Sequence, residues 1–268
     1  MSNQQTEGSA KSIFASIVIP VALAVAFLIF IFVLGSGSNF EDGNNENHPL
    51  PGNYLGLVYK GGWIVPILMS LFILVVTFSI ERYLTINRAA GKSSAHSFLS
   101  KVRSMLSSNN LSGVEGECDK QQGSLGAVVK SAMVKYKEVQ GEQNMDKDQK
   151  IVAIQKQIEE ATELEMPMLQ RNLVIISTIA TIGTLIALLG TVIGMIKAFS
   201  ALAQAGSPDS IALANGISEA LINTALGIGT SALAVISYNF FTTKIDALTY
   251  SIDEAGFSII NTFAANNK

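Results

Sequence analysis

The chain has 268 residues, of which 15% are charged and 49% are hydrophobic, and its formal net charge is −3. Average globular chains carry about 25% charged residues, so this composition excludes a disordered chain, a collagen-like rod and a polar repeat array. The slight acidic excess argues against nucleic-acid binding. A single cysteine, Cys118, excludes a disulfide framework and a multi-cysteine metal site. The two histidines, His48 and His96, lie far apart in polar stretches, and we expect no metal and no cofactor.

Four segments contain no Asp, Glu, Lys or Arg: 12–40, 61–80, 172–196 and 220–243. A membrane helix needs about 20 mostly apolar residues to cross a hydrocarbon core of about 30 Å. All four segments are long enough, and a chain in lipid satisfies its backbone hydrogen bonds as helix. The sequence therefore predicts an all-α integral membrane protein with four transmembrane helices.

The first span, residues 13–34, has a second interpretation as a secretory signal peptide. The small residues at 35–38 would permit cleavage. The apolar run is longer than the roughly 7–15 residues of a signal peptide, which favours an uncleaved span. Both interpretations stay open on the sequence.

The basic residues predict the orientation, because Lys and Arg accumulate on the cytoplasmic side. Most of them lie in the segment 81–171, and others are Lys11, Lys244 and Lys268, whereas the turn at 200–210 has none. We therefore expect both termini inside and this turn outside. The predicted order is a cytoplasmic tail with the first span (1–34), a periplasmic loop (35–60), the second span (61–80), a helical cytoplasmic domain (81–171), a transmembrane hairpin (172–243) and a cytoplasmic tail (244–268).

The segment 81–171 is too long and too charged for a simple loop. Apolar residues recur at helical spacing in three stretches: 95–106, 125–139 and 146–171. The Ser/Asn/Gly-rich stretch 107–116 predicts a break, and Pro167 is expected to bend the last helix. We expect the acidic cluster in that helix to be a solvated face rather than a binding surface or a metal site; it comprises Glu159, Glu160, Glu163 and Glu165. No phosphate loop and no Ser/His/Asp arrangement indicates a soluble enzyme here.

The third span carries more hydroxyl groups than a helix that faces lipid on all sides. At 100° per residue, four threonines share a face about 140° wide. They are Thr178, Thr181, Thr184 and Thr191. Gly190 and Gly194 form a GxxxG motif, which lets another helix approach closely.

The fourth span has a polar stripe as well, with Glu219, Asn223, Gly227, Thr230 and Ser231 on it and Thr224 at its edge. A carboxylate in a membrane helix is costly and usually faces a cavity or a partner. We expect Glu219 at the outer mouth of a pore, paired with Thr or Asn groups or with a neighbouring chain. Polar residues also join membrane helices without any pore. Two adjoining striped helices nevertheless favour a shared polar interface, which several copies in a ring could close into a pore.

Two blocks carry a family resemblance. Residues 188–199, LLGTVIGMIKAF, resemble the LLGTVxGMxxAF signature of the MotA/TolQ/ExbB proton channel family, and residues 217–227, ISEALINTALG, resemble its IAEALxxTAxG signature. The resemblance runs from about residue 61 to the C terminus and is closer to ExbB and TolQ than to MotA. Two features depart from the family: Thr184 and Leu233 stand where proline is frequent, and the first span is additional.

The resemblance implies a homo-oligomeric ring, pentameric in the family, in the bacterial inner membrane, with long helices extending from the membrane. Expected partners are membrane lipid, an ExbD- or TolR-like single-span protein that carries the protonatable Asp, and a TonB-like protein. The family's pore-lining threonines match Thr178 and Thr224, and its glutamate matches Glu219. The complete predicted proton path is Thr178, Thr181, Thr184, Thr191, Glu219, Asn223 and Thr224, with Gly190, Gly194 and Gly227 as packing residues.

The first interpretation is therefore an ExbB-like subunit that couples the proton-motive force to TonB-dependent outer-membrane transport. Within the same class, TolQ-like envelope maintenance and a gliding or flagellar motor are alternatives. A secondary transporter is a different class, and the scarcity of intramembrane charge argues against it. A passive membrane scaffold, in which the threonines only join helices, is the remaining alternative.

Overall fold

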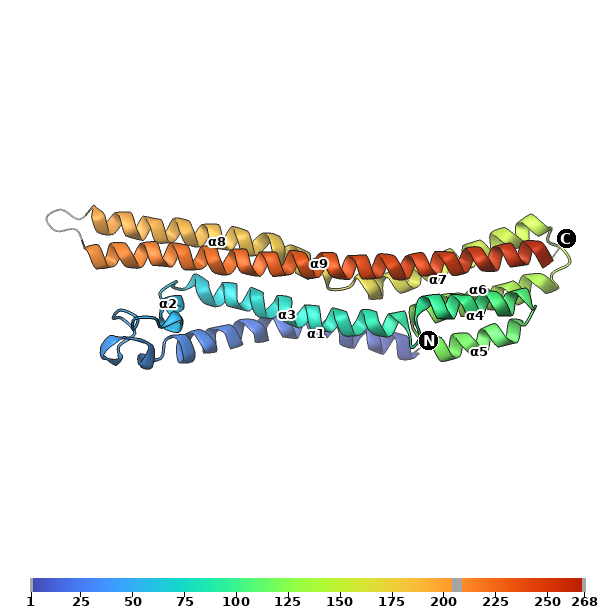
Figure 1. Cartoon of the computed structure of the whole chain (residues 1–268), viewed down its shortest axis with the longest axis horizontal. Helices are drawn as coiled ribbons and strands as arrows, with labels where there is room; N and C mark the ends of the chain where they lie inside the picture. Colours follow the sequence, from blue (N-terminus) through green and yellow to red (C-terminus); the bar gives the residue numbers. More distant parts are fainter. Residues whose placement is uncertain (1, 204–208, 267–268) are drawn as a thin grey trace. The chain divides into compact units, whose positions relative to one another are not determined.

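The computed structural model describes residues 2–203 and 209–266, with side chains from Phe14 onwards. The regular elements of the described residues are helices (Figure 1), and one isolated β-bridge joins Phe40 and Pro49. The chain divides into two compact units. Unit 1 comprises Met1–Ser79 and Asn172–Tyr238, and unit 2 comprises Ile80–Arg171 and Asn239–Lys268.

The predicted all-α class is confirmed, and so are four helices long and apolar enough to cross a membrane, which are α1, α3, α8 and α9. Helix α1 (Ser2–Leu28) continues as a π-helical turn (Ile29–Leu34). Short 3-10 turns follow at Gly37–Asn39 and Glu41–Gly43. The other helices are α2 (Tyr54–Tyr59), α3 (Ile64–Ala90), α4 (Ala95–Ser107), α5 (Leu111–Gln121), α6 (Gly123–Gly141), α7 (Lys147–Gln170), α8 (Leu173–Leu202) and α9 (Ser210–Asn266).

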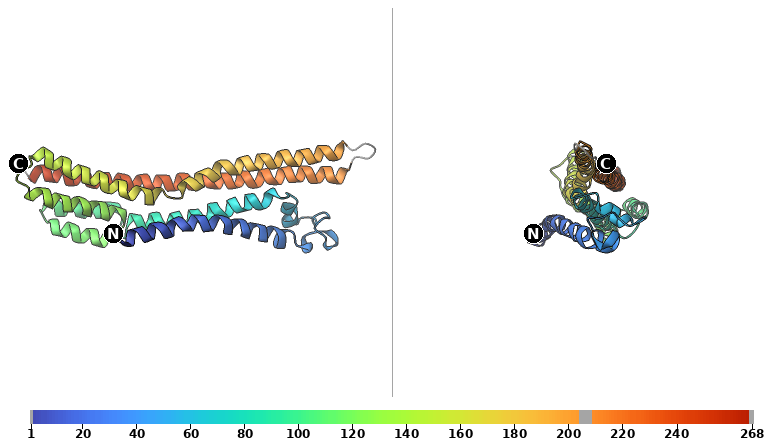
Figure 2. Two further views of the ribbon diagram at one scale, coloured as in Figure 1. Left: turned by 180° about the vertical axis from the view of Figure 1, so that it is seen from behind. Right: turned by 90° about the vertical axis from the view of Figure 1, so that its left-hand side faces the viewer.

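In unit 1, helix α1 lies beside the first part of α3 (Figure 2). Aromatic pairs join the two helices at two levels, since the Phe14 ring centroid lies 6.3 Å from that of Phe78 and the Phe27 centroid lies 6.4 Å from that of Trp63. The later residue of α1 meets the earlier residue of the α3 segment, so the two helices are antiparallel neighbours. The buried face of α1 and its π-helical turn repeats every four residues, at Ala22, Ala26, Phe30 and Leu34.

The segment 35–60 is folded back onto the end of the first span. The side-chain amide of Asn39 donates to the carbonyl oxygens of Val33 (2.7 Å) and Leu34 (3.0 Å), which the end of the helix leaves without intrahelical partners. The Tyr59 ring stacks on Phe30, with centroids 4.7 Å apart. These contacts make a compact structure out of a segment that was predicted only as a loop.

Unit 2 packs the four helices α4–α7 with the last part of α9, and its caps explain where these helices begin. Asp146 and Gln149 form a reciprocal capping box at the start of α7. The Asn110 side chain accepts from the backbone N–H of Gly113 at 2.9 Å and starts α5 there. The predicted break at 107–116 is therefore too long, because residues 111–116 already belong to α5.

The end of α7 is held by a buried arginine of α3. Arg82 is 2% exposed, pairs with Glu81, and donates to the carbonyl oxygens of Met168 (3.1 Å) and Leu169 (3.3 Å). Helix α7 passes through Pro167 and ends at Gln170. The guanidinium thus satisfies carbonyl groups that the helix terminus leaves free.

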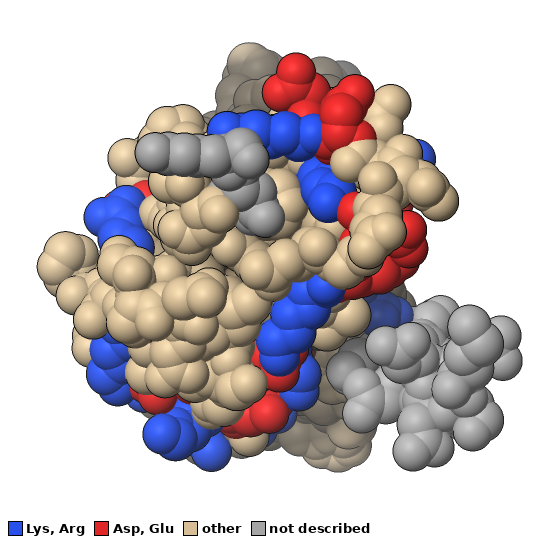
Figure 3. All heavy atoms as spheres, turned by 90° about the vertical axis from the view of Figure 1, so that its right-hand side faces the viewer, with Lys and Arg blue, Asp and Glu red and all other residues tan. Residues whose placement is uncertain are grey.

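On the face of the molecule that Figure 3 shows, positive and negative side chains lie interspersed at the surface. The last element of unit 2 is the continuation of α9, so residues 244–266 of the predicted tail are helical. Lys268, predicted to lie inside, is outside the described residues, as are residues 204–208 of the predicted outer turn.

Candidate functional site

The membrane hairpin of α8 and α9 is built on a row of small residues. The buried face of α8 presents Gly183, Ala187, Gly190, Gly194 and Ala198. A Cβ atom on Gly190 would lie 2.6 Å from the Cβ of Asn223, and one on Gly194 would lie 2.6 Å from the backbone nitrogen of Ala220. Gly227 of α9 lies against Ala187. The three predicted packing glycines therefore lie where the two helices approach most closely.

Hydroxyl groups of both helices meet along one edge of this hairpin. The Thr184 hydroxyl donates to the Ser231 hydroxyl at 2.9 Å, and the hydroxyls of Thr191 and Thr224 are hydrogen-bonded to each other. The two pairs are seven residues apart on each helix, which is about two turns, so they lie on the same side. We call Thr184, Thr191, Thr224 and Ser231 the hydroxyl edge.

Thr178 and Thr181 are exposed on α8. The Thr178 hydroxyl donates to the carbonyl oxygen of Val174 at 2.6 Å, within its own helix. A hydroxyl that bonds to the preceding turn keeps acceptor capacity for a further group. Three of the four threonines of the predicted stripe, Thr178, Thr181 and Thr184, are thus exposed in this chain, and Thr184 and Thr191 are joined to α9.

Glu219 lies apart from the hydroxyl edge and is 7% exposed. Its carboxylate oxygens accept from the Lys197 Nζ at 2.7 and 2.8 Å. Within this chain the partner of Glu219 is therefore a lysine and not the expected Thr or Asn group. Lys197 directly follows the uncharged part of the third span, and its flexible stem allows the ammonium group to reach the carboxylate.

Asn223 is fully buried and faces the corner between α2 and α3. Its Nδ2 donates to the carbonyl oxygen of Gly61 at 2.9 Å, a residue 162 positions away in the sequence. Its Oδ1 has no hydrogen-bond partner among the described residues. Gly62, which follows Gly61, has φ +75°, and a Cβ there would lie 2.7 Å from the Oε1 of Glu219. Glu219 and Asn223 of the second polar stripe thus point into the chain rather than along the hydroxyl edge.

Sequence reasoning did not name Lys197, Gly61 or Gly62 as site residues, and it placed Ser231 on the polar stripe without giving it a partner. One signal could have paired Lys197 and Ser231. In an antiparallel hairpin the numbers of facing residues add to a nearly constant total, and the pair Thr191–Thr224 sets that total. The pair Thr184–Ser231 has the same total, and the total of the pair Lys197–Glu219 differs from it by one. No comparable signal links α9 to the distant glycine corner.

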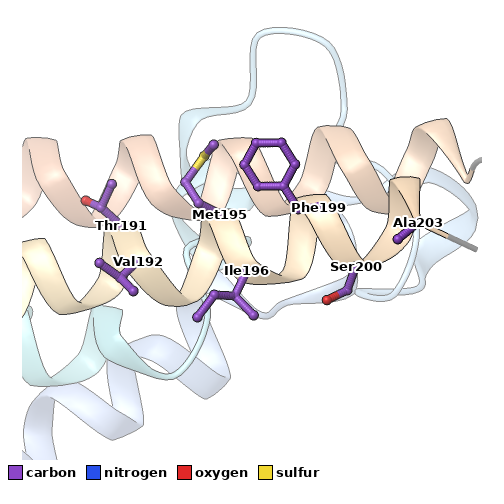
Figure 4. A pocket seen from close by; sticks show the side chains of 7 residues that line it. All are labelled: Thr191, Val192, Met195, Ile196, Phe199, Ser200 and Ala203. Atoms are coloured by element: carbon purple, nitrogen blue, oxygen red, sulfur yellow. The ribbon is translucent and has the colours of Figure 1, made fainter.

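A shallow pocket of about 570 Å³ opens beside the C-terminal half of α8 (Figure 4). Its lining is mostly apolar: Thr191, Val192, Met195, Ile196, Phe199, Ser200 and Ala203. It touches the hydroxyl edge at Thr191. All of its lining residues come from one helix, so it is open on the side away from α8.

Unit 2 offers less for a chemical site. The described residues contain no group of three His, Cys, Asp or Glu placed to hold a metal ion. Within the acidic cluster, Glu165 accepts from the Ser124 hydroxyl at 2.7 Å. Burial raises the pKa of Cys118 to about 12, so this thiol stays protonated at neutral pH.

Comparison with known proteins agrees with the motif resemblance. Residues 125–254 match the model of the MotA/TolQ/ExbB proton channel family, a range that includes α8, the hydroxyl edge and Glu219. One similar protein is the "Putative biopolymer transport protein ExbB-like 3" of Synechocystis sp., 34% identical over 86 residues, which are 31% of this chain and 41% of the relative.

Two further relatives bear ExbB and TolQ names. The "Tol-Pal system protein TolQ" of Haemophilus influenzae is 35% identical over 33% of this chain and 39% of its own length. The "Biopolymer transport protein ExbB" of Xanthomonas campestris pv. campestris is 27% identical over 43% of this chain and 46% of its own length. The matched part of the chain thus spans less than half the length of each of these relatives. Together with the four apolar helices, these matches indicate a multi-pass inner-membrane protein whose residues 125–254 match the model of the MotA/TolQ/ExbB proton channel family.

Proposed function

We propose that this chain is the ring-forming, ExbB-like subunit of a proton-driven motor or channel. It works with an ExbD-like single-span partner and a TonB-like protein, and it couples the proton-motive force to TonB-dependent outer-membrane transport. The observation that carries the proposal is the hydroxyl edge, which crosses from α8 to α9 and consists of neutral groups. The family match and the biopolymer-transport names of the relatives support it.

Neutral hydroxyls suit a path for protons carried by another chain. A hydroxyl donates one hydrogen bond and accepts others, so it can hold water and solvate a carboxyl group in either protonation state. One charge that crosses 100 mV gains about 2.3 kcal/mol, which a trapped proton would not deliver. The carboxylate of this hairpin, Glu219, is already paired with Lys197, and this pairing favours a proton carrier on the partner helix.

In a ring, the hydroxyl edges of several copies would surround a common axis. The family suggests five copies. Thr178 and Thr181, exposed in one chain, would then line the interior together with the edge. The open pocket beside Thr191 offers an apolar surface for a neighbouring or enclosed helix. The mass of the purified complex tests the copy number.

The central test changes Thr178→Val and Thr224→Val together. Valine nearly preserves the volume and removes the hydrogen-bonding group, so we expect assembly with the partner to survive in a pull-down. Energy-dependent uptake of a TonB substrate by the native host should fall strongly, because a drier path raises the cost of a charged carboxylate.

The matched control is Thr77→Val in α3, whose hydroxyl donates only to the Ile73 carbonyl of its own helix at 2.8 Å. This variant should keep normal uptake. If the Thr178→Val, Thr224→Val variant forms an intact complex and shows normal uptake, the hydroxyls serve only in helix packing. The channel proposal would then lose its basis.

TolQ-like envelope maintenance is the second candidate, supported by the TolQ relative of similar identity. The two functions differ in the phenotype of a deletion strain. Loss of a TonB energiser should abolish uptake of TonB-dependent substrates with an intact outer membrane. Loss of a Tol subunit should cause leakage of periplasmic proteins while uptake continues.

A further inference from the structure

The corner between α2 and α3 meets the membrane hairpin through an unusual set of contacts. Asn223 of α9 donates to the Gly61 carbonyl, and the Glu219 carboxylate lies directly against Gly62. Lys197 of α8 holds that carboxylate from the other side. Two separate parts of unit 1, the corner and α8, therefore converge on two side chains of α9.

The charged groups of Lys197 and Glu219 stabilise each other. A buried carboxylate without a partner is costly, and Glu219 is 7% exposed. Lys197 satisfies both carboxylate oxygens, at 2.7 and 2.8 Å, and its own side chain remains 54% exposed. The lysine thus neutralises the carboxylate where it packs against the corner and keeps its stem at the surface.

The two glycines leave the space that the contacts need. A side chain at Gly61 would collide with Ile222 of α9, whose Cγ2 would lie 2.8 Å from the added Cβ. Gly62 has a positive φ and no room for a Cβ beside Glu219. The backbone of the corner therefore packs directly against side chains of α9, with no space for a side chain between them.

We propose that Lys197, Glu219 and Asn223 form a clasp that fixes the Gly61–Gly62 corner, and with it the folded segment 35–60, to the hairpin. In this role Glu219 and Asn223 are positioning residues. Asn223 directly precedes Thr224, so a fixed Asn223 sets the rotation of α9 about its axis and the direction in which the Thr224 hydroxyl points. The clasp is a property of the single chain and goes beyond the proposed function.

Amide hydrogen exchange of the purified full-length chain tests the clasp. In residues 57–65, the backbone N–H groups of Gly61, Gly62 and Val65 bond to the carbonyl oxygens of Val58, Tyr59 and Gly62. Glu219→Gln and Lys197→Met each leave one charged group without its partner. Each variant should speed exchange in 57–65 about tenfold, the change expected when a hydrogen bond to a charged group is lost.

The double variant Lys197→Met, Glu219→Gln removes both charges and should return exchange close to the wild-type rate, because no unpaired charge remains. The matched control is Arg103→Met with Glu254→Gln, which removes an ion pair of 2.7 Å from unit 2 and should leave residues 57–65 unchanged. Exchange in α6 serves as a check on global folding.

Unchanged exchange at 57–65 in both folded single variants would overturn the clasp. If amide exchange in residues 57–65 is as fast in the double variant as in the single variants, the two side chains act independently. That result also overturns the clasp. If a single variant does not fold, the double variant must fold with wild-type exchange for the proposal to stand. The measurement needs no proton-motive force, so a failed clasp and a failed proposed function give different results.

Discussion

Glu117 in α5 shows how one residue of unit 2 depends on its neighbours. The Lys101 Nζ lies 2.6 Å from its Oε1, and the Lys120 Nζ lies 3.4 Å from its Oε2. The hydrogen bond from Lys101 lowers the pKa of Glu117 below its ordinary value of 4.5, although burial acts in the opposite direction. The charged form of Glu117 is therefore favoured in the folded protein.

We expect Lys101→Met to reduce the free energy of unfolding by about 1 kcal/mol at neutral pH, since the lysine is half exposed. The folded-state pKa of Glu117 is lowered, so the stabilisation is complete above pH 4.5 and is lost as the pH falls through the lowered pKa. Denaturation measured at pH 7 and at pH 3 should show a difference from wild type that shrinks with acid. A difference of equal size at both pH values would contradict the assignment.

At the scale of elements, the charge-free segments predicted the four long helices because a missing charge is a local property of the sequence. The break in unit 2 was predicted too long for a physical reason. Leu111 and Val114 continue a helical apolar pattern, and the Asn110 cap starts α5 despite the Ser and Gly residues around it. The first span was predicted without any contacts, and its packing against α3 came only with the structure.

Trp63, directly before α3, and Tyr54 of α2 are both exposed aromatic residues, at 72% and 78% exposure. Tryptophan and tyrosine favour the boundary between headgroups and hydrocarbon. Trp63 is the only tryptophan of the chain, so its fluorescence is specific. In liposomes, lipids brominated near the headgroup should quench it more than lipids brominated near the chain ends. If neither brominated lipid quenches the fluorescence and the emission is that of tryptophan in water, the corner does not lie at the membrane interface.

At the scale of the whole molecule, the orientation in the membrane is a prediction from the basic residues. Native Cys118 cannot report it, because a buried thiol with a pKa of about 12 reacts slowly from either side. A cysteine-free background, Cys118→Ala, is therefore needed. His48 and Gln143 are exposed positions in the predicted outer and inner parts.

In spheroplasts of that background, a membrane-impermeant maleimide should label His48→Cys and spare Gln143→Cys until the membrane is opened. Lysed cells should label both, which controls for reactivity. Labelling of Gln143→Cys in intact spheroplasts would reverse the orientation and place the hydroxyl edge in the opposite sense across the membrane.

The helical class, the four charge-free spans and the two family motifs could be predicted from the sequence, because each depends on residues close together in the chain. The helical periodicity also placed Thr184, Thr191 and Thr224 on polar stripes. The pairing of Glu219 with Lys197 and the bond from Asn223 to Gly61 became visible in the packed structure alone. Those contacts depend on the register and rotation of helices packed against one another. A helical wheel gives the direction of each side chain about its own axis and contains no information on the neighbour that it meets.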